Sequence, residues 1–142
     1  MQKLKLPEFE VKLKDKNIFC LVRKKWVVLT PEEWVRQHFL NLLISHLEYP
    51  KGMFRLEYSM SYFKNQKRSD ISALDKEGKM FLLVECKAPN VKLDQKVINQ
   101  VSEYNKVLDS QYVAITNGMN HFIWKREENR LTQINEFPFY QS

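Results

Sequence analysis

The sequence contains little glycine and cysteine and no long apolar run. Only three of its 142 residues are glycine and two are cysteine. Cys20 and Cys86 stand far apart and match no paired spacing of zinc or dithiol sites. No stretch is long and apolar enough to span a bilayer, and the N-terminus lacks the apolar segment of a signal peptide. We therefore expect one cytoplasmic domain over residues 1–142 that does not associate with membranes.

Aromatic and basic residues, by contrast, are plentiful. Aromatic side chains make up 13% of the chain and hydrophobic residues 44%, which is enough for a real core at this length. The 23 Lys and Arg outnumber the 17 Asp and Glu, so the net charge is +6. Such a balance favours a polyanionic partner over an acidic small substrate. One basic cluster covers residues 23–25, and a second, which we expect to contact DNA, consists of Lys64, Lys67 and Arg68. The alternative is that these basic turns are simply solvated.

The hydrophobic pattern predicts a mixture of helices and strands. Thr30 followed by Pro31 and Glu33 is typical of a helix start, with threonine as the N-cap and a capping box. Apolar spacing predicts helices from there to about residue 47 and over residues 93–108. Alternating or apolar runs predict strands at residues 9–13, 18–22, 26–28, 53–60, 70–74, 80–87, 111–116, 122–124 and 131–134.

These elements define a mixed α/β fold with three segments. The core, residues 30–117, has the order α-β-β-β-α-β. A β-rich extension over residues 1–29 precedes it, and a hairpin with a tail over residues 118–142 follows it. Such an order suggests one mixed sheet with helices against its faces.

The most informative pattern is a pair of carboxylates at one end of a predicted hairpin. Glu85 and Lys87 stand two apart in a strand and therefore share one face. If Glu77 and Gly78 form a two-residue loop, Asp70 comes to lie opposite Glu85. A four-residue loop would keep this face, whereas a three-residue loop would turn Asp70 away.

Two carboxylates at one point suit a hard divalent cation, Mg²⁺ or Mn²⁺. A lysine beside them can orient the attacking water and offset the charge that builds on a scissile phosphate. The alternative is a surface hairpin with alternating charges, because so short a pattern also occurs by chance. The apolar residues on both faces of these strands favour a site. Strands of this kind lie inside a covered sheet, where charges are costly unless they are paired or bound to metal.

The order of elements, together with this carboxylate pair, resembles the PD-(D/E)XK nuclease fold. More narrowly, it resembles the N-terminal nuclease domain of type I restriction enzyme R subunits. The resemblance extends from residue 30 to about residue 124. It rests on TPEEWVRQ at 30–37, RSDI at 68–71, VECKAP at 84–89, QVSEY at 100–104 and ITNG at 115–118.

The resemblance implies roles for individual residues. It makes Asp70 and Glu85 the metal ligands and Lys87 the residue that positions or activates water. Glu33, on the first helix, would add a further carboxylate to the site. The alternative for Glu33 is a capping-box residue that does not contact the metal.

Two residues of the second predicted helix match the family's Q-x-x-x-Y motif. Gln100 and Tyr104 stand four apart, so they project from one face of that helix. The resemblance implies that they contact the phosphate backbone near the metal. Without the resemblance, Tyr104 would be interpreted as a core residue and Gln100 as a helix residue with no functional role.

The implied function is metal-dependent hydrolysis of DNA phosphodiester bonds by an endonuclease-like domain of a restriction-modification system. Ser69 stands where the family has a proline that shapes the backbone. The sequence has no glycine-rich phosphate loop, so we expect a separate translocase, helicase or specificity subunit as partner. One alternative is a non-catalytic DNA-binding or accessory module of a restriction or defence system. Another is an assembly subunit that uses Trp26, Phe137 and Phe139.

Overall fold

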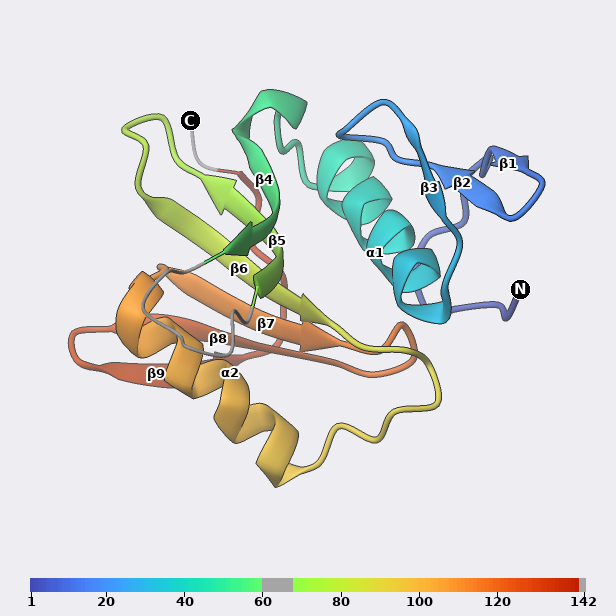
Figure 1. Cartoon of the computed structure of the whole chain (residues 1–142). Coiled ribbons are helices and arrows are strands. Elements are labelled where there is room, and N and C mark those ends of the chain that lie inside the picture. Colours follow the sequence, from blue (N-terminus) through green and yellow to red (C-terminus); the bar gives the residue numbers. More distant parts are fainter. Residues whose placement is uncertain (60–67, 141–142) are drawn as a thin grey trace.

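The computed structural model describes residues 1–59 and 68–140, apart from the side chains of residues 57–59, 68, 69, 104 and 106–108. Its main element is a six-stranded sheet with a helix on each face (Figure 1). In sheet order the strands are β4 (Phe54–Ser59), β5 (Arg68–Leu74), β6 (Met80–Cys86), β7 (Tyr112–Thr116), β8 (His121–Glu127) and β9 (Arg130–Ile134). β6 and β7 pair in parallel, whereas the other neighbours pair antiparallel. The mixed α/β fold is therefore confirmed.

Helix α1 (Pro31–Asn41) covers one face of the sheet. The Thr30 hydroxyl accepts a hydrogen bond from the Glu33 N–H at 3.0 Å, which confirms the predicted N-cap. The helix continues as a π-helical turn over Leu42–His46. Fully buried side chains of α1 and of the sheet face below it form the larger core cluster, among them Val35, Phe39, Leu40, Ile71, Ala73, Leu82, Val84 and Ala114.

Helix α2 (Gln95–Leu108) covers the opposite face and makes the crossover that parallel β6 and β7 require. The Asp94 side chain caps its start by accepting from the Val97 N–H at 3.0 Å. Asp109, in the left-handed conformation with φ 53°, ends it. A smaller buried cluster lies beneath this helix and consists of Leu83, Val101, Val113 and Ile115.

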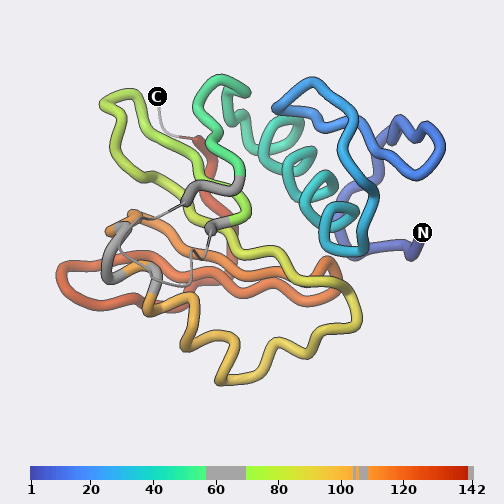
Figure 2. Tube along the Cα trace, viewed as in Figure 1, coloured from blue at the N-terminus to red at the C-terminus, as the bar shows by residue number. Residues whose placement is uncertain are grey.

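A second, three-stranded sheet lies beside α1, on the side away from the six-stranded sheet (Figure 2 shows the same arrangement). It consists of β1 (Leu13–Lys14), β2 (Asn17–Phe19) and β3 (Trp26–Val28). The first two strands are shorter than predicted. β3 spans only three residues before the α1 cap, so β2 can pair with it over three residues only.

The hairpin between β5 and β6 does not have the two-residue loop that would directly align Asp70 with Glu85. Its closing contact runs from the Asp75 N–H to the Lys79 carbonyl at 2.8 Å, so the loop has three residues. Gly78 adopts φ +82°, the left-handed conformation that such a loop needs at its last position. Of the loop lengths considered, this is the one that by itself would turn Asp70 away from Glu85.

The register of the carboxylates is nevertheless the expected one, because a bulge compensates for the loop. Ala73 pairs with Leu82 while Leu74 pairs with Met80, so β6 carries one extra residue at that point. Beyond the bulge Ile71 pairs with Val84, and the next position along each strand holds Asp70 and Glu85.

The bulge also moves Phe81 away from the face on which the alternation placed it. Phe81 is buried in the larger cluster on the α1 side, where its ring lies 5.9 Å from that of Tyr49 and 5.3 Å from that of Tyr112. Strict alternation along β6 would place it beside Leu83, which lies in the smaller cluster under α2. No helix among the described residues is long and apolar enough to cross a bilayer.

Candidate functional site

Three of the predicted site residues lie at the end of β6, where the strand leaves the sheet. The Lys87 ammonium lies 3.2 Å from a carboxylate oxygen of Glu85, as expected for side chains two apart on one face. One oxygen of Asp70, on the neighbouring strand, accepts the backbone N–H of Cys86 at 2.7 Å. Cys86 itself points into the core on the α1 side, as predicted.

Arg36 of α1 connects this group to the first helix. Its Nη2 donates to the second oxygen of Asp70 at 2.8 Å, and its Nη1 donates to Glu33 at 2.8 Å. Only 6% of the Arg36 side chain is exposed. One buried guanidinium therefore bridges two carboxylates from different elements, which offsets much of the cost of burying all three charges.

Glu33 is held from three sides. Besides Arg36, the amide of Gln37 donates to its second oxygen at 2.8 Å, and Arg23 lies 3.5 Å away. The same Gln37 accepts the backbone N–H of Leu21 at 2.9 Å. These contacts link the loop between β2 and β3 to Asp70 through Arg23, Glu33 and Arg36.

The electrostatics of the site depend on burial and on the closeness of its carboxylates. Burial, and next the negative charge of Asp70, raise the pKa of Glu85 to about 7, although Lys87 acts in the opposite direction. Burial alone would lower the pKa of Arg36, but attraction by Glu33 and Asp70 outweighs it and raises that pKa. Burial and the charge of Asp70 also raise the pKa of the Cys86 thiol, which keeps it protonated.

The four charged side chains of the site differ in their exposure to solvent. The exposed fraction of the side chain is 9% for Glu33, 14% for Asp70, 15% for Glu85 and 26% for Lys87. Lys87 is thus the most accessible of these groups, whereas Glu33 lies deepest. A substrate would meet Lys87 and Glu85 before it met Glu33.

Glu33 does not join the other two carboxylates in a three-ligand cluster. Among the described residues, no group of three or more His, Cys, Asp or Glu side chains is placed so that it could hold a metal ion. The candidate ligand set is therefore the pair Asp70 and Glu85. Two carboxylates are compatible with Mg²⁺, which is commonly bound by one or two carboxylates and completes its coordination with water and substrate phosphate.

Other predicted site residues lie elsewhere or are not described. Gln100 is exposed on α2, and for Tyr104 and Arg68 only the backbone is described. Lys64 and Lys67 lie outside the described residues. Contacts between these five residues and the carboxylate pair remain predictions.

Sequence reasoning missed Arg36, Gln37 and Arg23. Arg36 and Gln37 belong to a segment that carried the resemblance, but neither was given a role. A signal was present, because Arg36 stands three residues after Glu33 and so faces it on a helix. The contact of Arg36 with Asp70 spans 34 residues of sequence, and no local pattern indicates it.

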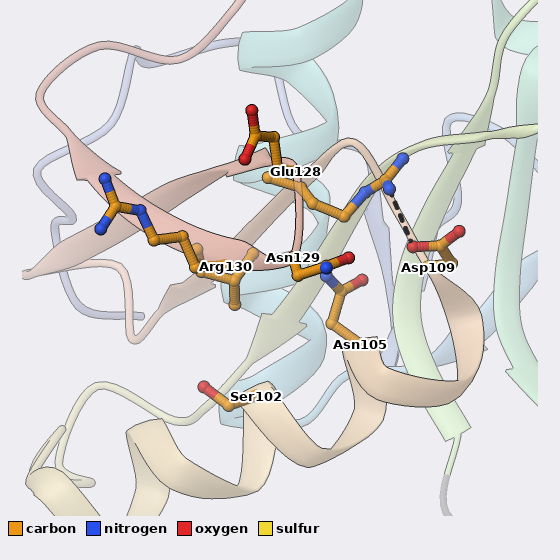
Figure 3. A pocket seen from close by; sticks show the side chains of 8 residues that line it. Ser102, Asn105, Asp109, Glu128, Asn129 and Arg130 are labelled. Carbon is orange, nitrogen blue, oxygen red and sulfur yellow. Dashed lines mark ion pairs between the residues drawn. The ribbon is translucent and has the colours of Figure 1, made fainter.

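A cavity of about 470 Å³ opens at the other end of the sheet, between α2 and the β8–β9 turn (Figure 3). Arg126 and Asp109 form an ion pair of 3.1 Å at its edge. Arg126 donates its backbone N–H to Gln111, just before β7 begins, whereas Glu85 aligns with Ile115 near the end of β7. The cavity is therefore separate from the carboxylate pair.

Comparison with protein families gives one match. Residues 31–138 match the family described as the type I restriction enzyme R protein N terminus. The matched range includes α1 and both strands of the candidate site, but it leaves out the β1–β3 sheet. No curated protein sequence matches the chain.

Proposed function

This chain belongs to the family of type I restriction enzyme R protein N termini, and from that membership we propose that it is a metal-dependent endodeoxyribonuclease domain of the PD-(D/E)XK type. Its reaction would be hydrolysis of DNA phosphodiester bonds. Residues 1–142 would act as a single domain, with DNA as substrate. The remainder of an R protein, or a separate translocase or specificity subunit, would be its partner.

The observation that carries this proposal is the register of the β5–β6 hairpin. Asp70 stands one position beyond the Ile71–Val84 pair, in line with Glu85, and Lys87 forms an ion pair with Glu85 at 3.2 Å. These are the residue types and the placement that the D…ExK pattern requires. A surface hairpin with alternating charges would leave them in solvent, whereas here only 14% of the Asp70 side chain, 15% of that of Glu85 and 26% of that of Lys87 are exposed.

Asp70 and Glu85 would hold Mg²⁺ or Mn²⁺, and the donor chemistry fits such an ion. Both are hard oxygen ligands, and burial with mutual repulsion makes the ionised pair unfavourable without a further positive charge. When bound, the ion would supply a more acidic water and stabilise charge on the phosphate.

Lys87 and Arg36 would have different duties. Lys87 is the more exposed, and its ammonium can orient the attacking water and offset negative charge on the phosphate in the transition state. Arg36 is buried and holds Asp70 through a charge-assisted hydrogen bond. Arg36 is therefore a positioning residue.

DNA would approach from the side where Lys87 is exposed. Gln100 and Tyr104 of α2, and the basic residues Lys64, Lys67 and Arg68 before Asp70, would contact the phosphate backbone. Phosphate contacts of this kind set the position of the duplex and carry no sequence preference.

Cleavage of plasmid and linear DNA in Mg²⁺ or Mn²⁺ tests the proposal directly. We expect cleavage by the unmodified chain and none by Asp70→Asn or Lys87→Ala. Glu77→Gln, which removes an exposed carboxylate from the tip of the same hairpin, is the matched control and should cleave normally. The catalytic proposal is wrong if these variants and the unmodified chain cleave at the same rate, or if the folded chain does not cleave at any metal concentration.

One observation favours a second candidate, a non-catalytic DNA-binding module of a restriction system. Arg36 already neutralises part of the charge on Glu33 and Asp70, so the fold can hold these carboxylates without a metal. This candidate predicts DNA binding that responds to salt but is unaffected by Mg²⁺ and by Glu85→Ala. Binding that Mg²⁺ strengthens, and that this variant loses, would exclude it.

A further inference from the structure

The positive charge of the chain is concentrated in the small N-terminal sheet. Residues 11–28 hold six of the 23 Lys and Arg side chains but only one of the 17 Asp and Glu. This segment therefore carries a net charge of +5 out of the total of +6. Its five lysines are all exposed: Lys12, Lys14, Lys16, Lys24 and Lys25.

The strand register sorts the side chains of this sheet into two faces. Paired residues of neighbouring strands point to the same side, and successive residues point to opposite sides. Leu13, Ile18 and Val27 align across the three strands. Ile18 is fully buried and Val27 partly buried, so this face is turned toward the protein interior at β2 and β3, whereas Leu13 on the edge strand β1 is 52% exposed. The opposite face carries the side chains of Lys14, Asn17, Phe19, Trp26 and Val28.

This outer face presents an aromatic pair within the basic surroundings. Phe19 pairs with Trp26 across the strands, and their rings meet edge to face with centroids 5.4 Å apart. Trp26 is 42% exposed and Val28 66%. The Lys12 ammonium lies 5.6 Å from the centre of the Phe19 ring. Exposing a tryptophan leaves a large apolar surface in contact with water, which a ligand could cover.

We propose that the outer face of the β1–β3 sheet binds a single strand of DNA, with an unpaired base stacked on Trp26 and lysines contacting the phosphates. Exposed aromatic rings on a positively charged sheet form the type of surface on which unpaired bases stack. In a duplex the faces of the bases are covered by their neighbours, so a ring on a sheet cannot reach them. The charge complements a polyanion rather than a second copy of this basic chain.

The sheet is also attached to the candidate active site. The loop that joins β2 to β3 bonds to Gln37 through Leu21 and reaches Glu33 through Arg23. DNA held on this face would therefore be held by a body that packs directly on α1. The sheet lies outside the matched range of residues 31–138, so family membership does not by itself assign this surface.

Binding of a fluorescent oligo(dT) to the full chain in EDTA tests the proposal without any cleavage. We expect binding that weakens steeply with salt and that Trp26→Ala weakens by roughly fivefold to a hundredfold, the range set by base stacking. Trp26→Phe should keep most of the affinity and serves as the check on folding. Phe139→Ala, which removes another exposed aromatic side chain at 59% exposure, is the matched control and should bind as the unmodified chain does.

The lysines should determine how strongly the affinity for oligo(dT) depends on salt, whereas Trp26 should determine the contribution of base stacking. Replacing Lys12 and Lys14 by Gln should reduce the slope of log K against log salt by about 1.4, because each phosphate contact to a single strand contributes about 0.7. Trp26→Ala should leave that slope unchanged. Replacing Lys76 and Lys79, two exposed lysines at the β5–β6 turn, by Gln is the control for charge alone and should have little effect.

Three results would overturn the proposal. In the first, Trp26→Ala and the unmodified chain bind oligo(dT) equally. In the second, duplex DNA of the same length binds more tightly than the single strand. In the third, light scattering shows a dimer that Trp26→Ala dissociates, while the single strand binds neither form. If the unmodified chain binds oligo(dT) as expected but does not cleave DNA, only the nuclease proposal is wrong.

Discussion

Arg36 and Asp70, 34 residues apart in the sequence, are joined by a charge-assisted hydrogen bond of 2.8 Å. The bond fixes α1 to the first residues of β5, at the position where the carboxylate of Asp70 also meets β6 through Cys86. Glu33 receives the other arm of the same guanidinium. The position of Asp70 is thus set by contacts from a helix and from a neighbouring strand.

Arg36→Met should destabilise the fold strongly. It would leave Glu33 and Asp70 buried without their main counter-charge, and we expect the free energy of unfolding to fall by about 3–5 kcal/mol. Urea unfolding measures the change. Arg126→Met breaks the half-exposed pair with Asp109 and is the matched control, for which we expect a loss below about 1 kcal/mol. Equal losses of unfolding free energy in the two variants would mean that the Arg36 bridge stabilises the fold no more than a surface ion pair does.

Glu85 should make stability depend on pH. Its pKa rises from 4.5 to about 7 on folding, so the folded state binds the proton more tightly than the unfolded state. The resulting stabilisation is complete below pH 4.5 and is lost as the pH rises to about 7, by roughly 3 kcal/mol at most.

Glu85→Gln removes this titration and tests the assignment. Its free energy of unfolding should change less between pH 5 and pH 8 than that of the unmodified chain. At pH 8 the variant should be the more stable of the two, because the buried charge is gone. Parallel pH profiles for the two proteins would show that another group is responsible.

Divalent cations should stabilise the chain through Asp70 and Glu85. If Mn²⁺ binds the folded state alone, a concentration of 100 times its Kd adds about 2.7 kcal/mol to stability. The Mn²⁺-induced rise in Tm should be larger at pH 8 than at pH 6, since Glu85 must lose its proton. Asp70→Asn should abolish that rise, whereas Glu77→Gln should keep it. A rise that survives in Asp70→Asn would place the ion elsewhere.

The two glycines with positive φ should differ in their tolerance of alanine. Gly78 has φ +82° and open space around its missing Cβ, so Gly78→Ala should cost only the backbone term of about 1–2 kcal/mol. Gly118 has φ +84°, and a Cβ there would lie 2.8 Å from a Leu4 methyl group. Gly118→Ala should therefore cost about 1–3 kcal/mol more, as overpacking does.

Shortening the neighbour tests the packing part of this difference. Combined with Leu4→Ala, the change at Gly118 should cost less than it does alone, because the closest contact of its Cβ is then gone and only a Val35 methyl group at 3.2 Å remains. Thermal unfolding of the single and double variants measures this coupling. Strict additivity would show that the contact with Leu4 contributes nothing to the cost at Gly118.

Local rules predicted much of the fold. Thr30 and Pro31 started a helix as expected, because capping depends on residues within one turn. Alternation put Cys86 in the core and Glu85 with Lys87 on the other face, because a strand has a period of two. Membership of the restriction family also followed from short segments in a fixed order, and the family match confirms it.

The hairpin shows where local reasoning left the register open. A three-residue loop should have turned Asp70 away from Glu85, and the extra residue in β6 at Phe81 restored the alignment. A bulge is not written in the alternation of a single strand. It is selected by packing, here by the aromatic cluster that receives the Phe81 ring.

The sequence by itself determined the helices and strands, their order, the family, and the two strands that carry Asp70 and Glu85. The tertiary structure decided that the buried cation Arg36 bonds to Asp70, and it decided which side of the small sheet meets solvent. The reason is that capping and periodicity act over a few residues. The pairing of Arg36 with Asp70, and the exposure of Trp26, depend instead on how α1 packs between two sheets.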